Sequence, residues 1–76
     1  MSKKFYYILT IDEDGYESAR EEVDENGKHL SIYRKKGDAK KRTEWYSWGE
    51  DIVKECTKAD FDLLVRIFKF DDYKII

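Results

Sequence analysis

The two side chains best suited to acid–base or covalent chemistry each occur once, as His29 and Cys56. A Cys–His dyad requires the two groups to meet in space, and the residues around them form no nucleophile signature. Cys56 precedes Thr57, an expected helix start, where the helix dipole could lower the thiol pKa. A lone cysteine is more often a small core residue, and His29 is expected on an exposed strand. We therefore predict that the protein is not an enzyme.

A calcium site is the second chemistry to weigh. In a loop starting at Thr10, Asp12, Asp14 and Glu21 fall at the third, fifth and twelfth positions of an EF-hand, with Gly15 at the sixth. Thr10 stands where the first carboxylate ligand is needed, and the residues before it favour a strand. Asp and Gly are also the residues that any tight turn selects. We therefore predict a turn here, and neither a metal nor a cofactor.

Acidic charge is concentrated in one part of a chain whose net charge is only −2. Residues 12–25 contain eight acidic side chains against a single cation, Arg20. Such a tract could occupy a basic groove on a target protein, of the kind that binds nucleic acid. We therefore predict a protein-binding surface made of this tract and an aromatic sheet face, with the contact residues Asp12, Asp14, Glu21, Glu22, Tyr33, Tyr46 and Trp48.

Basic charge is concentrated at residues 34–42, where six cations surround Asp38. Aromatic residues follow directly, so an alternative function is nucleic-acid binding with Tyr33, Tyr46 or Trp48 stacking on bases. The phosphate contacts would then come from Arg34, Lys35, Lys36, Lys40, Lys41 and Arg42. The simpler interpretation is a solvated hairpin turn whose charge is balanced by acidic loops nearby.

Short antiparallel strands are the elements expected to position these side chains. Turn signals recur at regular intervals, and Asn26-Gly27 is the strongest because both residues tolerate positive φ. Alternating apolar residues predict strands at residues 4–11, around Leu30 and Ile32, and at about 42–48. The last of these would place Trp45 toward the core, with Tyr46 and Trp48 on the other face.

Residues 16–23 are open between a strand and a helix. Asp14 could cap a helix here, and Gly27 lies just past its end. Only Tyr16, Ala19 and Val23 would form the apolar side of that helix, so we favour a strand.

A helix at the C-terminal end is the clearest prediction. Thr57 can cap it, and Asp60 lies three residues on, near the positive end of the helix dipole. The helix is expected to end near Phe70, and residues 73–76 could return as a short edge strand. Its apolar face follows helical spacing and consists of Phe61, Leu64, Val65 and Phe68, widened by Leu63, Ile67 and Phe70.

These elements predict an α+β fold in one compact domain, residues 1–76, with a three- to four-stranded antiparallel sheet and one C-terminal helix on one face. The alternative, if residues 16–23 are helical, is a ferredoxin-like β-α-β-β-α-β order. In an up-and-down meander the acidic turn at 12–14 would lie beside the basic segment. Both faces of the sheet look apolar, so part of that surface is expected to serve a partner.

The remaining expectations concern location and role. The N-terminal residues have no signal-peptide pattern, and no run approaches the length of a membrane span. A single cysteine is typical of a reducing, cytoplasmic protein. The leading hypothesis is a small non-enzymatic adaptor or inhibitor, of the type that phages and mobile elements encode. Its partner would be a protein of unknown identity or a second copy of the chain. We expect no binding to a membrane.

Overall fold

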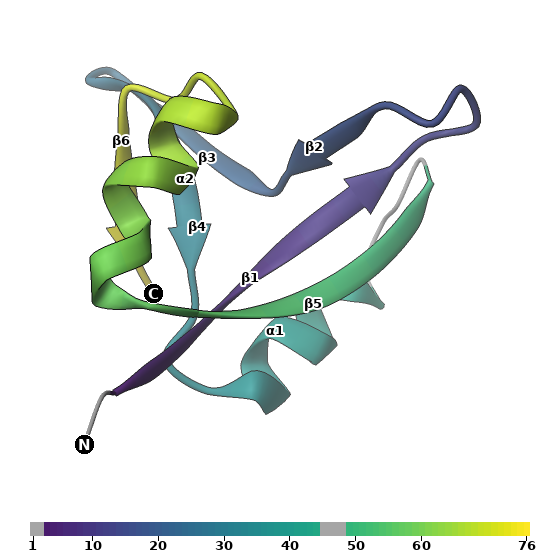
Figure 1. The fold of residues 1–76 in the computed structure, drawn as a ribbon, viewed down its shortest axis with the longest axis horizontal. Coiled ribbons are helices and arrows are strands. Elements are labelled where there is room, and N and C mark those ends of the chain that lie inside the picture. The colour runs from purple at the N-terminus through teal and green to yellow at the C-terminus, as the bar shows by residue number, and fades with distance from the viewer. Residues whose placement is uncertain (1–2, 45–48) are drawn as a thin grey trace.

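The computed structural model describes residues 3–44 and 49–76, and its fold class is α+β, as predicted. In this part of the chain six strands form two three-stranded sheets, which Figure 1 shows with a helix against each. One sheet has the order β2-β1-β5, with β1 at Lys4–Ile11, β2 at Glu17–Ala19 and β5 at Glu50–Thr57. The other has the order β3-β4-β6, with β3 at Glu21–Asp24, β4 at Gly27–Ile32 and β6 at Asp72–Ile75. The helices are α1 at Lys36–Thr43 and α2 at Phe61–Ile67, and a 3-10 turn, η1 at Lys58–Asp60, precedes α2.

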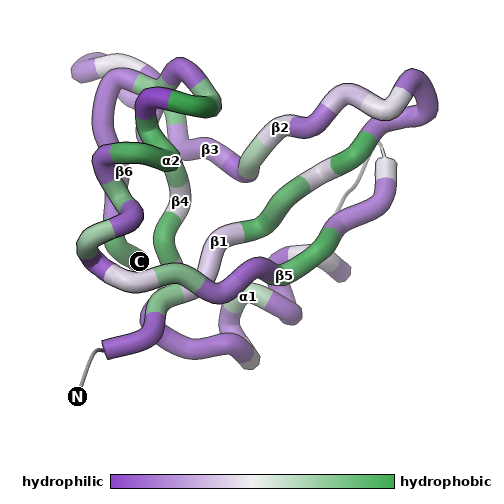
Figure 2. The backbone as a smooth tube through the Cα atoms, in the orientation of Figure 1, coloured by the Kyte–Doolittle hydropathy of each residue, from purple (hydrophilic) through white to green (hydrophobic). Residues whose placement is uncertain are grey.

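Strand β1 lies at the centre of the fold and has the predicted bounds. It pairs with β2 on one side and along its whole length with β5 on the other, from Lys4 opposite Thr57 to Ile11 opposite Glu50. Apolar side chains occur at both odd and even positions of β1, and Figure 2 shows β1 as one of the greenest strands. Because alternate residues point to opposite faces, the apolar residues of β1 supply two separate cores.

The two cores lie on opposite faces of β1 and have different covers. On one face α2 and the second sheet bury a cluster that consists of Phe5, Ala19, Leu30, Ile32, Cys56, Phe61 and Leu64. On the other face α1 covers a smaller cluster of Ile8, Tyr33 and Ala39. Both apolar faces of the sheet are therefore used internally, which removes much of the surplus that the sequence suggested for a partner.

The chain passes from one sheet to the other at Arg20, which separates β2 from β3. The Arg20 N–H donates to the Ile8 carbonyl in the first sheet, and the Arg20 carbonyl accepts from the Ser31 N–H in the second, both at 3.0 Å. Residues 16–23 are thus strand rather than helix, as favoured. The ferredoxin-like order is wrong, because it needs a helix in this segment.

The basic segment differs most from expectation. The predicted hairpin turn at 34–42 is wrong, because residues 36–43 form α1. Of the strand predicted at about 42–48, residues 42–43 are helical, and residues 45–48 lie outside the described residues. Five of its eight residues are Ala, Lys or Arg, which have good helix propensity, but only one side chain, Ala39, is buried, so no apolar periodicity marks the helix in the sequence. The strand that follows is β5. Trp45, Tyr46 and Trp48 lie outside the described residues.

Helix α2 begins as predicted and ends earlier. The Asp60 carboxylate accepts from the Thr57 N–H at 2.8 Å and the Thr57 hydroxyl at 3.1 Å, which completes a capping box at the start of η1. The helix ends at Ile67 rather than near Phe70, and Lys69 adopts a left-handed φ of 60°. The tail returns as the edge strand β6, as predicted, but it runs parallel to β4 rather than antiparallel.

No helix in the described residues is both long enough and apolar enough to cross a membrane.

Candidate interaction surfaces

Part of the acidic tract holds its own turns together. The Asp12 carboxylate accepts hydrogen bonds from the backbone N–H groups of Asp14 and Tyr16, both at 2.9 Å. This is an Asx turn, in which the side chain replaces a backbone acceptor. Residues 9–19 therefore form the β1–β2 hairpin rather than a cation-binding loop, since Thr10 lies in β1 and bonds to Asp51, while Glu21 lies in β3 of the other sheet. Of the predicted contact residues here, Asp14 is exposed and Asp12 is structural.

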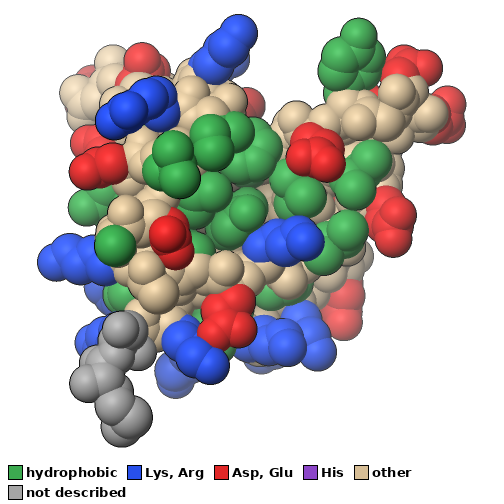
Figure 3. All heavy atoms as spheres, viewed as in Figure 1, with side chains coloured by type: hydrophobic (Ala, Val, Ile, Leu, Met, Phe, Trp, Pro, Cys, Tyr) green, Lys and Arg blue, Asp and Glu red, His purple; other side chains and the backbone are tan. Residues whose placement is uncertain are grey.

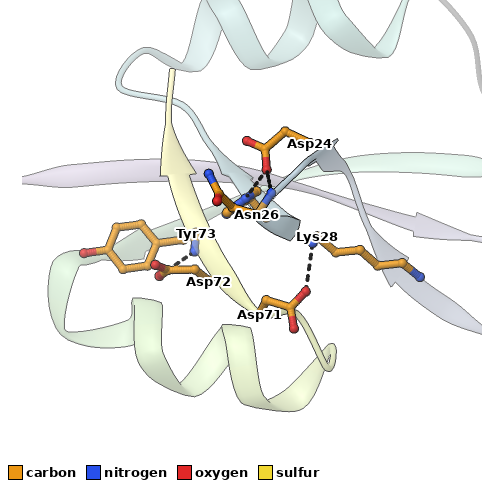
Figure 4. A network of polar contacts seen from close by, with 7 residues as sticks. Asp24, Asn26, Lys28, Asp71, Asp72 and Tyr73 are labelled. Carbon is orange, nitrogen blue, oxygen red and sulfur yellow. Dashed lines mark hydrogen bonds and ion pairs between the residues drawn. The ribbon is translucent and has the colours of Figure 1, made fainter.

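The second turn of the tract, between β3 and β4, is also built by carboxylates (Figure 4). Asp24 accepts from the Asn26 N–H at 2.8 Å and contacts His29 Nε2 at 2.9 Å. The Asn26 hydrogen bond first, and the His29 contact second, lower the pKa of Asp24. The His29 side chain is 13% exposed, so the expectation of an exposed histidine is wrong. It stabilises a turn.

The same turn is hydrogen-bonded to Asp71, the residue directly before β6. The Asp71 carboxylate accepts from the Lys28 N–H at 2.9 Å, and Figure 4 shows this contact beside the Asp72–Tyr73 pair. Gly27 has a left-handed φ of 121°, and a Cβ at this position would collide with the Asp71 carboxylate. The backbone conformation therefore favours glycine here, and a side chain would displace the Asp71 carboxylate.

The two remaining acidic candidates face different depressions. Glu21 is exposed and lines a depression of about 390 Å³ between the β2–β3 segment and the C-terminal end of α2. Glu22 is half-buried and lines a smaller one of about 280 Å³, together with Tyr33 and α1 residues. The acidic candidates thus do not form one contiguous site.

The aromatic candidates do not form an exposed sheet face in the described residues. Tyr33 is only 4% exposed and packs with Ile8 and Ala39 beneath α1. Burial is the main cause of the raised pKa of its phenol. The expectation that Tyr33 stands exposed for a partner is therefore wrong. Tyr46 and Trp48 lie outside the described residues.

An apolar surface on α2 was not selected from the sequence. Leu63 is 55% exposed and Ile67 is 59% exposed, one turn apart on the outer side of the helix, while Phe61 and Leu64 face the core. Ile67 and the half-buried Phe68 also line the larger depression. Figure 3 shows hydrophobic side chains gathered over α2 and across toward the β1–β2 hairpin. We call this region, with Leu63, Ile67, Phe68, Glu17 and Glu21, the α2 surface.

The signal for the α2 surface was present in the sequence. The apolar face of residues 61–70 was predicted to be wide, with Leu63 and Ile67 beyond the narrower stripe that starts at Phe61. A helix that covers a small sheet needs only about a 100° stripe. An apolar face wider than this stripe leaves apolar side chains outside the core.

The basic candidates all lie on or directly before α1, and all are exposed. Figure 1 places α1 well apart from the β1–β2 turn, and Figure 3 shows mainly Lys and Arg side chains along the molecule's edge over α1 and the start of β1. The expectation from a meander, that the acidic turn at 12–14 lies beside the basic segment, is therefore wrong. The acidic turn and the basic helix are therefore separate, although Glu22 of the acidic tract lines one depression together with Lys41 and Arg42 of α1.

A buried polar contact joins the strands between these regions. Arg20 and Asp51 form an ion pair of 2.7 Å, with side chains only 14% and 5% exposed. The Thr10 hydroxyl donates to the other Asp51 oxygen, also at 2.7 Å. A buried pair of this kind is costly to break, because removal of one partner leaves an uncompensated charge. It fixes β5 against the Arg20 crossing point.

Cys56 is buried in the larger core, and the pKa of its thiol is raised to about 11. Desolvation is the largest cause, and the negative charges of Asp60 and Glu55 add to it. A neutral buried thiol is a poor nucleophile. The arrangement favours packing over the lowered pKa that its place before a helix suggested.

Comparisons with known proteins add no identity. No protein-family model matches the chain, and neither does any curated protein or solved structure.

Proposed function

We propose that this protein is a non-enzymatic binding module that docks a basic segment of another protein on its α2 surface, and so acts as an adaptor or inhibitor. One observation carries the proposal: Leu63 and Ile67 are more than half exposed, and Ile67 lines a depression of about 390 Å³. Exposed aliphatic side chains at the edge of a concavity are typical of protein interfaces.

The charge around the depression favours a partner segment with basic side chains. Glu17 and Glu21 lie on its rim, and both belong to the acidic tract at 12–25. Arg20 also lines it but is neutralised by Asp51, which leaves Lys69 as the cation at this rim. A partner segment with an apolar side chain flanked by Lys or Arg therefore complements the surface. In a symmetric contact between two copies, the acidic rims would meet and repel.

The environments of Cys56 and His29 support binding without catalysis. The Cys56 thiol is buried with a raised pKa, and His29 is engaged by Asp24. The proposal places the protein in the cytoplasm, where its one thiol stays reduced. An adaptor or inhibitor of a basic, nucleic-acid-binding protein is the role that best combines the acidic tract with the apolar contact.

Photo-crosslinking followed by binding measurements tests the proposal. A photoreactive residue at position 63 should capture a partner from the host lysate that the same residue at position 40, on α1, does not. With that partner purified, Leu63→Ser/Ile67→Ser should weaken binding by about 100-fold in calorimetry, as expected for two central apolar contacts. The matched control, Val23→Ser/Ile76→Ser, removes apolar side chains that are exposed elsewhere and should change affinity by less than about threefold.

Charge reversal separates the rim from the rest of the tract. Glu17→Lys/Glu21→Lys should weaken binding more than Glu13→Lys/Glu25→Lys, which makes the same charge change away from the depression. Asp12 is left intact, because its substitution would disrupt the β1–β2 turn. Equal losses from both pairs, or a dimer in light scattering that Leu63→Ser/Ile67→Ser dissociates, would refute a basic partner at this surface.

A further inference from the structure

We infer that α1 and the residues leading into it form a second, independent binding surface, which contacts the phosphate backbone of duplex nucleic acid without sequence preference. This goes beyond the proposed protein-binding function and uses the opposite side of the first sheet.

Charge segregation is the first argument. Residues 34–42 carry six cations and one acid, a net charge of +5, while residues 12–25 carry eight acids and one cation, a net charge of −7. The net charge of the chain is −2, so the remaining residues sum to zero. The overall charge therefore conceals a strongly basic patch. At physiological salt the Debye length is about 8 Å, so a ligand at α1 is governed by the local charge rather than by the total.

The structure of the segment is the second argument. As a hairpin turn it would place its cations on a small loop, but as a helix it buries only Ala39 and leaves its charged side chains exposed. In residues 3–44 and 49–76, no ion pair uses a lysine of α1. The Tyr6–Tyr33 bridge also brings the start of β1, with Lys3, beside the segment that enters α1.

The composition of the exposed face selects the ligand. Apart from buried Ala39, every residue of α1 is polar, charged or glycine. A membrane-surface helix needs an apolar face to insert, which α1 lacks. No aromatic ring is exposed on α1, and the neighbouring Tyr33 is buried, so described residues here offer no platform for stacking unpaired bases. Lysines on flexible stems suit a duplex backbone, where contacts are electrostatic and independent of sequence.

Fluorescence anisotropy with a labelled 20-base-pair duplex tests the inference. In the variant Lys35→Gln/Lys36→Gln/Lys40→Gln/Lys41→Gln, four positive charges are lost while helix propensity is kept, because Gln and Lys are similar helix formers. The matched control, Lys28→Gln/Lys54→Gln/Lys69→Gln/Lys74→Gln, removes the same charge from exposed lysines elsewhere. Circular dichroism and thermal melting establish that both variants are folded.

The expected result is micromolar binding at low salt, with log K falling against log salt at a slope of about −4 for four to five phosphate contacts. The α1 variant should lose at least about tenfold more affinity than the control and most of this slope. Leu63→Ser/Ile67→Ser should bind the duplex normally, so failure of the protein-binding proposal would not affect this test. Equal losses in both lysine variants, no binding by the wild type at 20 mM salt, or equally tight binding to anionic phosphatidylserine vesicles would overturn the inference.

Discussion

The two helices lie on opposite faces of the same strand pair and have opposite surfaces. Helix α2 buries Phe61 and Leu64 and exposes aliphatic side chains, whereas α1 buries Ala39 and exposes cations. Figure 2 shows the contrast as a largely green α2 and a mainly purple α1. Helix α2 is thus anchored in the core and also exposes apolar side chains. Helix α1 buries little and exposes charged side chains. This difference is the reason for proposing a different partner for each helix.

The largest test of the comparison removes the anchor of α2. Phe61 is 1% exposed and lies between the rings of Phe5 and Tyr73, with centroid distances of 5.1 and 4.8 Å. Phe61→Ala should lower the free energy of unfolding by about 3–5 kcal/mol in urea denaturation, because it leaves a cavity in the larger core. A loss below about 1 kcal/mol would mean that α2 is no better anchored than α1.

The next test ionises the core beneath α2. The Cys56 thiol has a folded pKa of about 11 against an ordinary value of 9.0, so the unfolded chain loses its proton first as pH rises. The free energy of unfolding should therefore be unaffected by this group below pH 9 and fall between pH 9 and 11, by at most about 1.4 kcal/mol per pH unit. Urea denaturation across this window should show the free energy of unfolding of the wild type falling relative to that of Cys56→Ala. If the two free energies change in parallel with pH, the thiol is not the cause.

The smallest effects are expected in α1 and have opposite signs. Ala39→Gly should destabilise the protein by about 1 kcal/mol, from lost helix propensity and a lost buried methyl. Gly37→Ala should stabilise it by about 0.5–1 kcal/mol, since a Cβ at Gly37 meets no atom within 4 Å and stiffens the unfolded chain. Thermal melts of the two variants measure both, and a destabilising Gly37→Ala would indicate that its backbone is strained.

The same contrast explains which elements could be predicted. Strand β1 and the start of α2 were predicted because their apolar residues follow periods of 2 and 3.6, and because Thr57 and Asp60 form a local capping box. Helix α1 was missed because a helix that buries one alanine has no apolar period. Its charged sequence is equally compatible with a turn, and only its packing over Ile8 and Tyr33 distinguishes the two.

The candidate surfaces were predictable to a lesser extent. Charge density located both the acidic tract and the basic segment, but not that Asp12 and Asp24 are occupied by turn hydrogen bonds. Nor could alternation alone reveal that both faces of β1 are covered, which buries Tyr33. Exposure of Leu63 and Ile67 depends on how wide a core the sheet offers, and that is a property of the assembled strands.

The crossing at Arg20 limits how this chain can vary in length. One residue serves as donor to the first sheet and acceptor from the second, so β2 and β3 keep their registers only if this connection stays one residue long. Because side chains alternate along a strand, an insertion or deletion here would reverse every side chain from one flank onward. Ser18, the neighbour of Ala19 in β2, would then take the buried place of Ala19 against the core. Insertions and deletions are better accommodated at the β1–β2 turn. The connection at Arg20 is the place where the length of the chain cannot change.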